Sequence, residues 1–593
     1  MTSNLASEVN GVEDEDAALR RAIAMSLGQD VSDDEPASPS RTNGLGNSQT
    51  QVTTSAPTDD NTSALQQPAT SSMAALGLDR KKMEEERLAR LRKRKADDAL
   101  PDRSNTDGEI ERERATRRRT GLDLNPKPES SSQDASAGLK YPKGAVLKTW
   151  ARGVPREGDI KIEEVFQKDD LQLAVLSSFQ WDEDWLMSKL NLRQTKVLLI
   201  AYAKDEEQKN EMRQNTPPET IRFVFPPMDG IASAGCMHSK LQLLKYPKSL
   251  RIVVPTGNLV PYDWGETGSM ENMVFLIDLP RIEDPVERKK HTLTHFGQEM
   301  CFFLGAKGVD DKMLESLRNY DFSETARYGF VHTIAGSHPQ PDLWQRTGYC
   351  GLGRTVKALR LESAGAIELD YICSSIGAVN RDLLAALYNA CQGDTGLKEY
   401  TSRAGRAAKG KAKGTAAAAS RADLLDLTKI RVYFPSRETV DRCRGGRQSA
   451  GTIRFQSRWW NAASFPRAVL RDCKNVRSGI LMHSKVIYVQ RPAASLVRGA
   501  AQGWAYVGSH NLSESAWGRL VKDRGTGEPK LNARNWECGV LVPTQETTSS
   551  SSSGTAQEAE KLEMFRGAVP VPVELPAQPY HGNDRQPWFA EEA

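Results

Sequence analysis

Short apolar runs alternate with amphipathic helical segments along the chain from about residue 139. Apolar runs of this kind, bounded by turn-forming residues, are typical of buried β-strands. Helical spacing follows several of them, as in Asp182–Leu190 and His295–Phe303. The expected strands are Leu173–Leu176, Val197–Ala201, Ile221–Phe225, Arg251–Val254, Met273–Ile277, Ala366–Cys373, Ile430–Phe434, Ile480–Val489, Trp504–Val507 and Glu537–Val542. Alternating strands and helices predict an α/β layered architecture.

The same pattern restarts after about residue 340, which predicts two similar α/β domains over 139–340 and 341–593. Two segments interrupt the second domain, near 396–424 and 545–558, and their Ala/Gly/Lys-rich and Ser/Thr-rich compositions predict flexible insertions. The first insertion carries basic residues and no acidic residue between 403 and 421. It either follows a phosphate backbone or is a solvated loop.

Residues 1–138 have the composition of a disordered arm, with no aromatic residue before Tyr141. Within the arm, residues 13–28 begin with acids and then place four residues on one helical face. These residues are Leu19, Ala22, Ile23 and Ser26. The small side chains in this stripe admit a close partner, and the segment resembles a ubiquitin-interacting motif. The alternative is an amphipathic helix without a partner.

Two basic clusters, within 90–95 and 117–119, resemble a bipartite nuclear import signal and predict a nuclear protein. A solvated charged helix is the alternative, because acids at 84–86 lie beside the first cluster. The eight cysteines form no C-x-x-C pair, so neither a zinc site of that type nor a disulfide framework is expected. No apolar run approaches the ~20 residues that span a bilayer. We expect an intracellular protein without membrane contact.

The tetrapeptide Met-His-Ser-Lys occurs twice, at Met237–Lys240 and Met482–Lys485. Each copy leads into an apolar run, and each next run ends in a turn with an asparagine, Asn258 or Asn511. Side chains at i and i+2 of an extended segment share a face, so His and Lys of each copy point into one space. Two such units supply imidazoles for attack and proton transfer, and cations and amides for phosphoryl charge. The sequence therefore predicts one phosphoryl-transfer site at the seam of the two domains, without a metal or cofactor.

The duplicated motif resembles the phospholipase D superfamily. The usual aspartate after the lysine is absent from both copies, and the downstream asparagines make the chain similar to the type one tyrosyl-DNA phosphodiesterase family, of a fungal type. The similarity covers roughly 140–593 and includes Ser178–Leu186, Ser374–Gly377, Gly508–Gly518 and Asn535–Leu541. It implies two phospholipase D-like α/β/α sandwich domains related by pseudo-two-fold symmetry.

The resemblance also implies a reaction. DNA 3′ ends, single-stranded or frayed, would lose a tyrosine or peptide left by topoisomerase I, through a covalent phosphohistidine, and end in a 3′-phosphate. The resemblance implies a monomer with His238 as nucleophile and His483 as general acid and base. Lys240, Lys485, Asn258 and Asn511 would hold the phosphoryl oxygens, and Glu537 would orient an active-site histidine. Substrate contacts are expected from Ser374, Ser375, Ser509 and Ser513.

Two positions depart from the family. Ala234 stands where animal members have a base-stacking aromatic residue, and the family's glutamine partner of the second histidine falls near Glu271 or Asn272. Two other functions stay open: a phospholipase or nonspecific nuclease of the same superfamily, and a non-catalytic DNA or ubiquitin adaptor. The missing aspartates argue against the first, and the intact His, Lys and Asn sets argue against the second.

Overall fold

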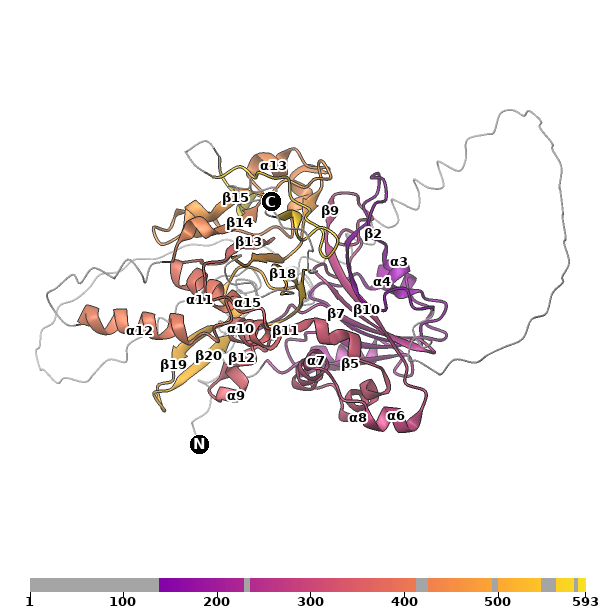
Figure 1. Cartoon of the computed structure of the whole chain (residues 1–593). Coiled ribbons are helices and arrows are strands. Elements are labelled where there is room, and N and C mark those ends of the chain that lie inside the picture. Colours follow the sequence, from indigo (N-terminus) through magenta and orange to yellow (C-terminus); the bar gives the residue numbers. More distant parts are fainter. Residues whose placement is uncertain are drawn as a thin grey trace, which may run out of the picture. The chain divides into compact units, whose positions relative to one another are not determined.

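A computed structural model describes residues 138–228, 235–411, 425–492, 500–544, 562–580 and 585–592, without the side chains of 407–411. The ubiquitin-type motif at 13–28, the basic clusters at 90–119, Ala234 and the segment 545–558 lie outside the described residues. Two mixed β-sheets form the framework, one in each half of the sequence (Figure 1).

The first sheet has eight strands. Their order is β2 (Asp159–Ile160), β1 (Ala145–Thr149), β10 (Met273–Pro280), β8 (Ser249–Pro255), β7 (Leu241–Lys245), β3 (Leu173–Ser177), β4 (Lys196–Ile200) and β5 (Ile221–Val224). Strands β3, β4 and β5 run parallel, and β7, β8 and β10 alternate in direction.

The second sheet repeats this arrangement. Its order is β11 (Gly329–Thr333), β21 (Asn535–Pro543), β18 (Gly503–Gly508), β17 (Val486–Gln490), β13 (Glu368–Ile372), β14 (Ile430–Phe434) and β15 (Leu470–Asp472). From β21 to β15 the directions match those from β10 to β5. The duplication expected from the sequence is therefore present in the topology.

Helices cover the outer faces of the two sheets. On the first sheet, α3 (Ile162–Phe166) and α4 (Glu183–Ser188) bury Phe166 and Leu186 in a core with β3, β4 and β8. On the second, α10 (Gly348–Ala358) and α11 (Arg381–Cys391) pack on β13 and β14. The other elements are α5 (Glu206–Gln214), α6 (Pro285–Lys290), α7 (His295–Ala306), α8 (Asp311–Ser316), α9 (Pro341–Trp344), α12 (Leu397–Lys411), α13 (Arg437–Asp441), α14 (Ser457–Asn461), α15 (Glu514–Trp517), β12 (Gly336–His338), β19 (Arg519–Lys522) and β20 (Pro529–Ala533).

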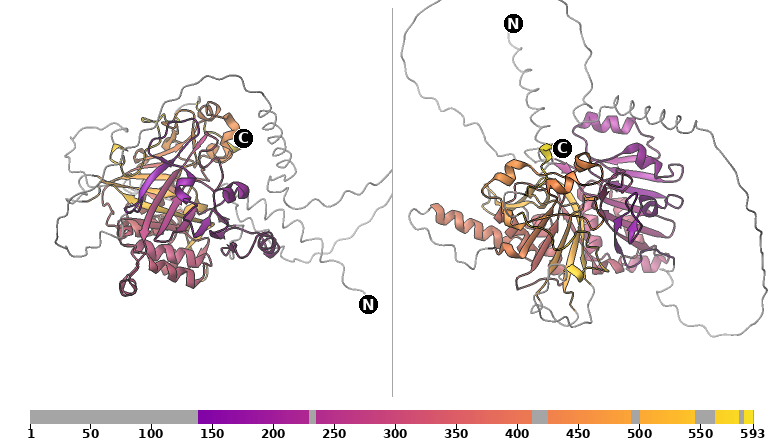
Figure 2. Two further views of the ribbon diagram at one scale, coloured as in Figure 1. Left: turned by 90° about the vertical axis from the view of Figure 1, so that its right-hand side faces the viewer. Right: turned by 90° about the horizontal axis from the view of Figure 1, so that it is seen from above.

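The two halves share a hydrophobic core. Ile252 and Phe275 of the first sheet belong to the same buried cluster as Tyr488, Val507 and Val540 of the second. The halves lie side by side in Figure 1 and in the right-hand view of Figure 2. Because this cluster removes apolar area from water on both sheets, it holds the halves in one orientation.

Two very short strands cross between the halves. β6 (Cys236–Met237) pairs with β21 of the second half, and β16 (Leu481–Met482) pairs with β9 (Met270–Glu271) of the first. The backbone N–H of His238 donates to the Trp536 carbonyl (3.0 Å), and that of His483 donates to the Glu271 carbonyl (3.0 Å). Each histidine motif is thereby fixed to the opposite half.

Three sequence expectations need correction. The second sheet already begins with β11 at Gly329, so the domain boundary lies before residue 340. The expected strand Ile480–Val489 divides into β16 and β17, because β16 pairs with the other half. The segment from 396 is not wholly a flexible loop: α12 extends to Lys411, and Arg403 pairs with Glu399 at 2.7 Å.

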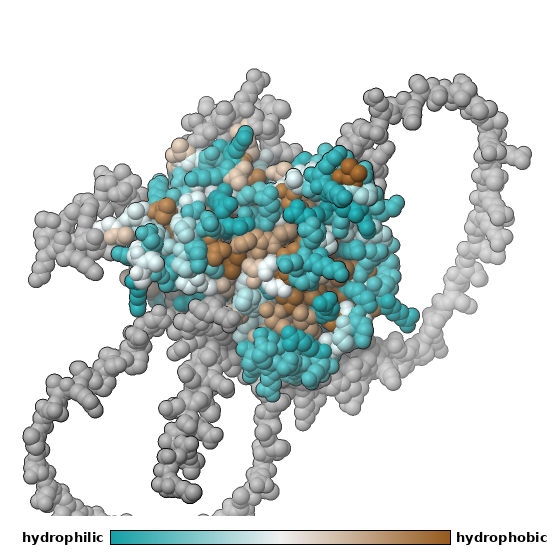
Figure 3. Space-filling model, turned by 90° about the horizontal axis from the view of Figure 1, so that it is seen from below, coloured by the Kyte–Doolittle hydropathy of each residue, from teal (hydrophilic) through white to brown (hydrophobic). Residues whose placement is uncertain are grey.

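The surface seen from below in Figure 3 is largely hydrophilic, with apolar residues gathered near its centre. Within the described part of the chain, no helix is both long and apolar enough to cross a membrane.

Candidate active site

Both Met-His-Ser-Lys copies lie in the interior, between a crossing strand and a strand of their own sheet. His238 is 6% exposed and His483 4%, while Lys240 and Lys485 are fully buried. The two motifs are close enough that Lys485 influences the pKa of His238 and Lys240 that of His483. The structure therefore brings together the histidine–lysine pairs predicted from the sequence.

Each imidazole is held by a carboxylate from the other half of the chain. His238 Nδ1 lies 2.8 Å from Glu537 Oε2, and His483 Nδ1 lies 2.9 Å from Asp263 Oδ1. Both carboxylates are fully buried. A hydrogen bond from Nδ1–H to a carboxylate fixes the tautomer and leaves Nε2 for the reaction.

The two carboxylates reach their histidines by different routes. Glu537 comes directly from β21, next to Trp536, whose carbonyl holds His238. The equivalent position in the first half is Asn272, which follows Glu271. Asn272 does not contact His483; its Nδ2 donates to the Asp263 backbone and Oδ1, both at 3.0 Å. The support expected from Glu271 or Asn272 thus comes from Asp263, with Asn272 as the residue that orients it.

The two asparagines are anchored alike. Asn258 Oδ1 accepts from the backbone N–H of Gln180 (3.4 Å), and Asn511 Oδ1 accepts from that of Ser375 (3.0 Å). Because the side-chain oxygen is fixed in this way, the amide nitrogen points in the other direction. From there it can donate a hydrogen bond to a phosphoryl oxygen. The Asn258 nitrogen also donates to Gln180 Oε1 at 3.3 Å.

The two lysines are fixed by carbonyl groups at the seam. Lys240 Nζ donates to the His238 carbonyl (2.8 Å), and Lys485 Nζ donates to the carbonyls of His483 and Thr256. Thr256 belongs to the first half, just before Asn258. The ammonium groups therefore stay next to both histidines, as required to neutralise a bound anion.

The electrostatics of the site favour neutral imidazoles and ionised carboxylates. Burial lowers the pKa of His238 to about 4 against the opposing effect of Glu537, and burial likewise lowers that of His483 to about 4 against Asp263. Burial alone would raise the pKa of each carboxyl, but the facing imidazole and lysine charges lower both to about 2. Burial also lowers the pKa of both lysines. The negative charge of an incoming phosphodiester counteracts this effect of burial and raises the pKa values of the histidines and lysines again.

The four predicted substrate-contacting serines have hydrogen bonds within the protein. Ser374 Oγ donates to Asn511 Oδ1 (3.3 Å), and the backbone N–H of Ser375 donates to the same oxygen. Ser509 Oγ donates to Glu537, and Ser513 Oγ accepts from the Ala516 backbone at the start of α15. The geometry thus makes Ser509 a support of Glu537, while substrate contact by these serines stays a prediction.

Sequence reasoning missed Asp263, Gln180 and Lys307. Lys307 is fully buried at the end of α7, and its Nζ donates to Ser239 Oγ at 2.6 Å, behind the first motif. Burial lowers its pKa to about 8. Asp263 lies in the Asn258 turn, where its carboxylate accepts from the Asn258 N–H at 2.6 Å, and the sequence alone does not distinguish it from an ordinary turn aspartate.

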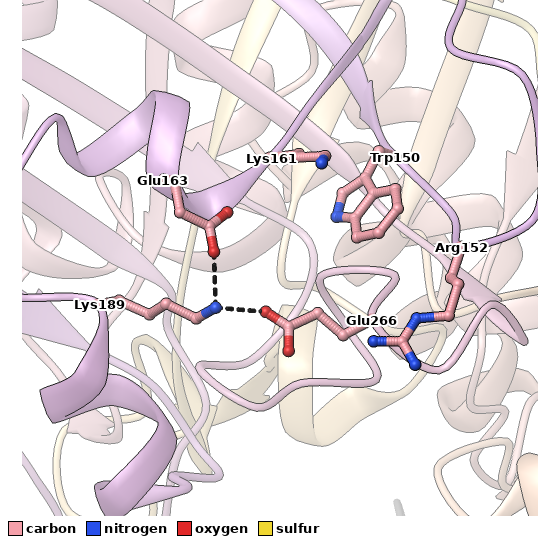
Figure 4. A pocket seen from close by; sticks show the side chains of 6 residues that line it. All are labelled: Trp150, Arg152, Lys161, Glu163, Lys189 and Glu266. Atoms are coloured by element: carbon pink, nitrogen blue, oxygen red, sulfur yellow. Dashed lines mark hydrogen bonds and ion pairs between the residues drawn. The ribbon is translucent and has the colours of Figure 1, made fainter. Parts of the chain in front are cut away.

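No cluster of three or more His, Cys, Asp or Glu among the described residues is placed to hold a metal ion. A separate pocket lies in the first half, where Lys189 bridges Glu163 (2.6 Å) and Glu266 (2.7 Å) beside Trp150 and Arg152 (Figure 4). It contains neither histidine motif, so it is distinct from the candidate active site.

Comparison with known proteins matches the sequence of this chain to a family. A model of the family described as tyrosyl-DNA phosphodiesterase matches residues 145–581. The chain belongs to the tyrosyl-DNA phosphodiesterase family. Tyrosyl-DNA phosphodiesterase 1 of Arabidopsis thaliana is 24% identical over 484 residues, which are 72% of this chain and 71% of the relative.

Solved structures show the same fold. A crystal structure of the yeast tyrosyl-DNA phosphodiesterase aligns with a TM-score of 0.51 at 15% identity, covering 75% of this chain and 99% of the yeast chain. A mutant form of the yeast enzyme aligns with a TM-score of 0.51 at 16% identity, covering 75% and 98%. As a family member, the chain is an enzyme of the phosphoric diester hydrolase class. The α/β fold predicted from the sequence is thereby confirmed.

Proposed function

We propose that this tyrosyl-DNA phosphodiesterase family member hydrolyses 3′-phosphotyrosyl and related 3′ adducts on DNA through a covalent phosphohistidine. The observation that carries the proposal is the paired arrangement of two buried imidazoles, each with Nδ1 held by a buried carboxylate from the other half. One imidazole can attack phosphorus while the other transfers protons.

In the first step, Nε2 of neutral His238 attacks phosphorus and the P–O bond to the tyrosine breaks. Protonated His483 gives its Nε2 proton to the departing phenolic oxygen. In the second step, His483, now neutral, takes a proton from water, and the water oxygen attacks phosphorus. The P–N bond breaks, His238 is restored, and the DNA leaves with a 3′-phosphate.

Burial favours neutral His483, whereas the first step needs its protonated form. The bound phosphodiester supplies the negative charge that restores this form, because it faces Lys240 and Lys485 together with the imidazole. The lysines and the amides of Asn258 and Asn511 stabilise the five-coordinate transition state. Because these groups can neutralise the negative charge of the phosphoryl group during its transfer, we propose that the reaction needs no metal ion.

The biological context is part of the same proposal. Adducts of this kind are the tyrosine or peptide left by a type I topoisomerase on single-stranded or frayed 3′ ends. The basic clusters at 90–119 support nuclear import, and Leu19, Ala22, Ile23 and Ser26 support ubiquitin binding. We propose that the enzyme acts as a monomer, because both halves of the site come from one chain.

The test is cleavage of a 3′-phosphotyrosyl oligonucleotide in the presence of EDTA, with phosphatidylcholine vesicles as the alternative substrate. Wild-type protein should release tyrosine, His483→Ala should accumulate a protein–DNA adduct, and His238→Ala should form none. The matched control is His295→Ala, because His295 at the start of α7 contacts neither motif. Strict metal dependence, or cleavage of lipid in place of DNA, would contradict the proposal.

A further inference from the structure

Phe179 is an exposed aromatic ring directly beside the proposed nucleophile. Its ring centroid lies 5.4 Å from that of His238, and the residue is 37% exposed. The residue follows β3, in the segment whose next residue, Gln180, holds Asn258. An exposed apolar ring of this size next to a reacting group can stack on a planar group of the substrate.

The direction of the reaction decides which part of the substrate meets this ring. In an in-line displacement the attacking and leaving atoms lie on opposite sides of phosphorus. His238 attacks, so the leaving tyrosine departs on the side of His483. A ring packed against His238 lies on the side of phosphorus opposite the leaving group, so the retained nucleotide, whose 3′ oxygen is equatorial, is the part of the substrate within its reach. Stacking on an aromatic ring suits any base, because every base has a π-face.

A second exposed ring continues the surface. Tyr202 is 40% exposed and follows β4, the parallel neighbour of β3 in the register Ser177↔Ile200. Phe179 and Tyr202 each stand two residues beyond that paired position. Burial and the nearby Cys236, two residues before His238 in the chain, raise the pKa of Tyr202.

The surface ends beyond Tyr202. The next residues include Asp205 at the cap of α5 and two acids, Glu206 and Glu207, in its first turn. Lys204 and Lys209 pair with Asp205 and Glu206, so in the described part of the chain the edge beyond Tyr202 offers a DNA strand neither a further exposed ring nor a strong net charge.

We propose that Phe179 and Tyr202 form a base-stacking platform that holds the two nucleotides nearest the cleaved bond. The proposal rests on the proposed function, since it uses His238 as the nucleophile. Phe179 takes the base nearest the 3′ end and Tyr202 the next one, without selecting among the bases.

The experiment compares KM and kcat of full-length variants on 3′-phosphotyrosyl oligonucleotides. Phe179→Ala should raise KM by roughly 10-fold, the size of one stacking contact, with kcat nearly unchanged. Phe179→Tyr should keep the wild-type values. Tyr202→Ala should raise KM only for substrates of two or more nucleotides. Val286→Ala is the matched control, because Val286 is an exposed apolar residue of α6 (57% exposed).

A substrate with an abasic site at the 3′-terminal nucleotide shows which group stacks on the Phe179 ring. The KM of wild-type protein should rise on this substrate by about the same factor as the Phe179→Ala substitution raises it on the intact strand. The KM of Phe179→Ala should not rise further. If the Phe179→Ala defect persists on the abasic strand and changes with the leaving group, the ring holds the adduct and the platform is wrong. An equal fall of kcat on every substrate would show packing on His238 alone, which also overturns it. Failure of wild-type protein to cleave any phosphotyrosyl oligonucleotide would instead reject the proposed function.

Discussion

Asp263 offers the sharpest test of the assigned roles, because it supports His483 and has no contact with His238. Asp263→Asn keeps the size of the side chain but removes the charge that faces Nδ1 of His483 at 2.9 Å. A hydrogen bond to a charged group is worth about 1.5–3 kcal/mol. At ~1.4 kcal/mol per factor of ten, every step in which His483 carries a proton should slow by roughly 10- to 150-fold.

The assay separates the two steps by the leaving group. A tyrosine needs a proton from His483 to depart, whereas 4-nitrophenol departs without one. With a 3′-(4-nitrophenyl phosphate) oligonucleotide, Asp263→Asn should release a rapid burst of nitrophenolate and then turn over slowly, because His483 also activates the water of the second step. The protein–DNA adduct should accumulate on denaturing gels.

Glu537→Gln is the matched control, because Glu537 holds His238 in the same way at 2.8 Å. It should slow both leaving groups, give no burst and accumulate no adduct. If Asp263→Asn slowed tyrosine and nitrophenol substrates equally and formed no adduct, the assignment of His483 as general acid and base would be refuted.

Three further predictions concern stability and are checked by urea unfolding. Burial lowers the pKa of His238 and His483 from 6.5 to about 4, so between these pH values the unfolded chain binds more protons than the folded one. The free energy of unfolding should therefore fall by up to roughly 3 kcal/mol per imidazole from pH 6.5 to 4. Histidine-to-alanine variants whose stability keeps the same dependence on pH would contradict this. Lys307, with its pKa lowered to about 8, should make stability rise by up to ~3 kcal/mol between pH 8 and 10.5, and Lys307→Met should abolish that rise. Arg477 donates to the first half at the Thr149 carbonyl (2.8 Å) and pairs with buried Glu271 (3.0 Å), so Arg477→Met should cost about 3–5 kcal/mol, whereas an unchanged urea midpoint would show that the pair is dispensable.

Local patterns were sufficient to predict most of the framework. Apolar runs at 173–176, 197–201 and 251–254 correspond to β3, β4 and β8, because strand formation follows from burial of residues close together in sequence. The repeated motif also located the four basic side chains of the site. Its asparagine turns were found for the same reason, since each follows the next apolar run downstream of its motif.

Features that depend on pairing between the halves were not predictable. Asp263 meets His483 across 220 residues, and nothing local distinguishes it from an ordinary turn aspartate. The division of the strand expected at 480–489 has the same cause, because β16 pairs with β9 of the first half. α12 was missed for a different reason: an Ala/Gly/Lys-rich composition fits both a helix and a flexible segment, and the contact of Arg403 with Glu399 favours the helix.

The exchanged supports explain why the two halves can act only together. In either half alone, one histidine would lose both its backbone partner and its carboxylate, since both come from the other half. The exchange is not symmetric. Glu537 is held rigidly on β21, which suits a nucleophile that must face phosphorus in one orientation. Asp263 lies in a loop and is oriented by the Asn272 side chain, whereas Glu537 is oriented by the side chains of Ser509 and Asn535. The two halves therefore differ at one equivalent position, with a glutamate in one and an asparagine in the other, and this difference accords with the two separate roles proposed for the histidines.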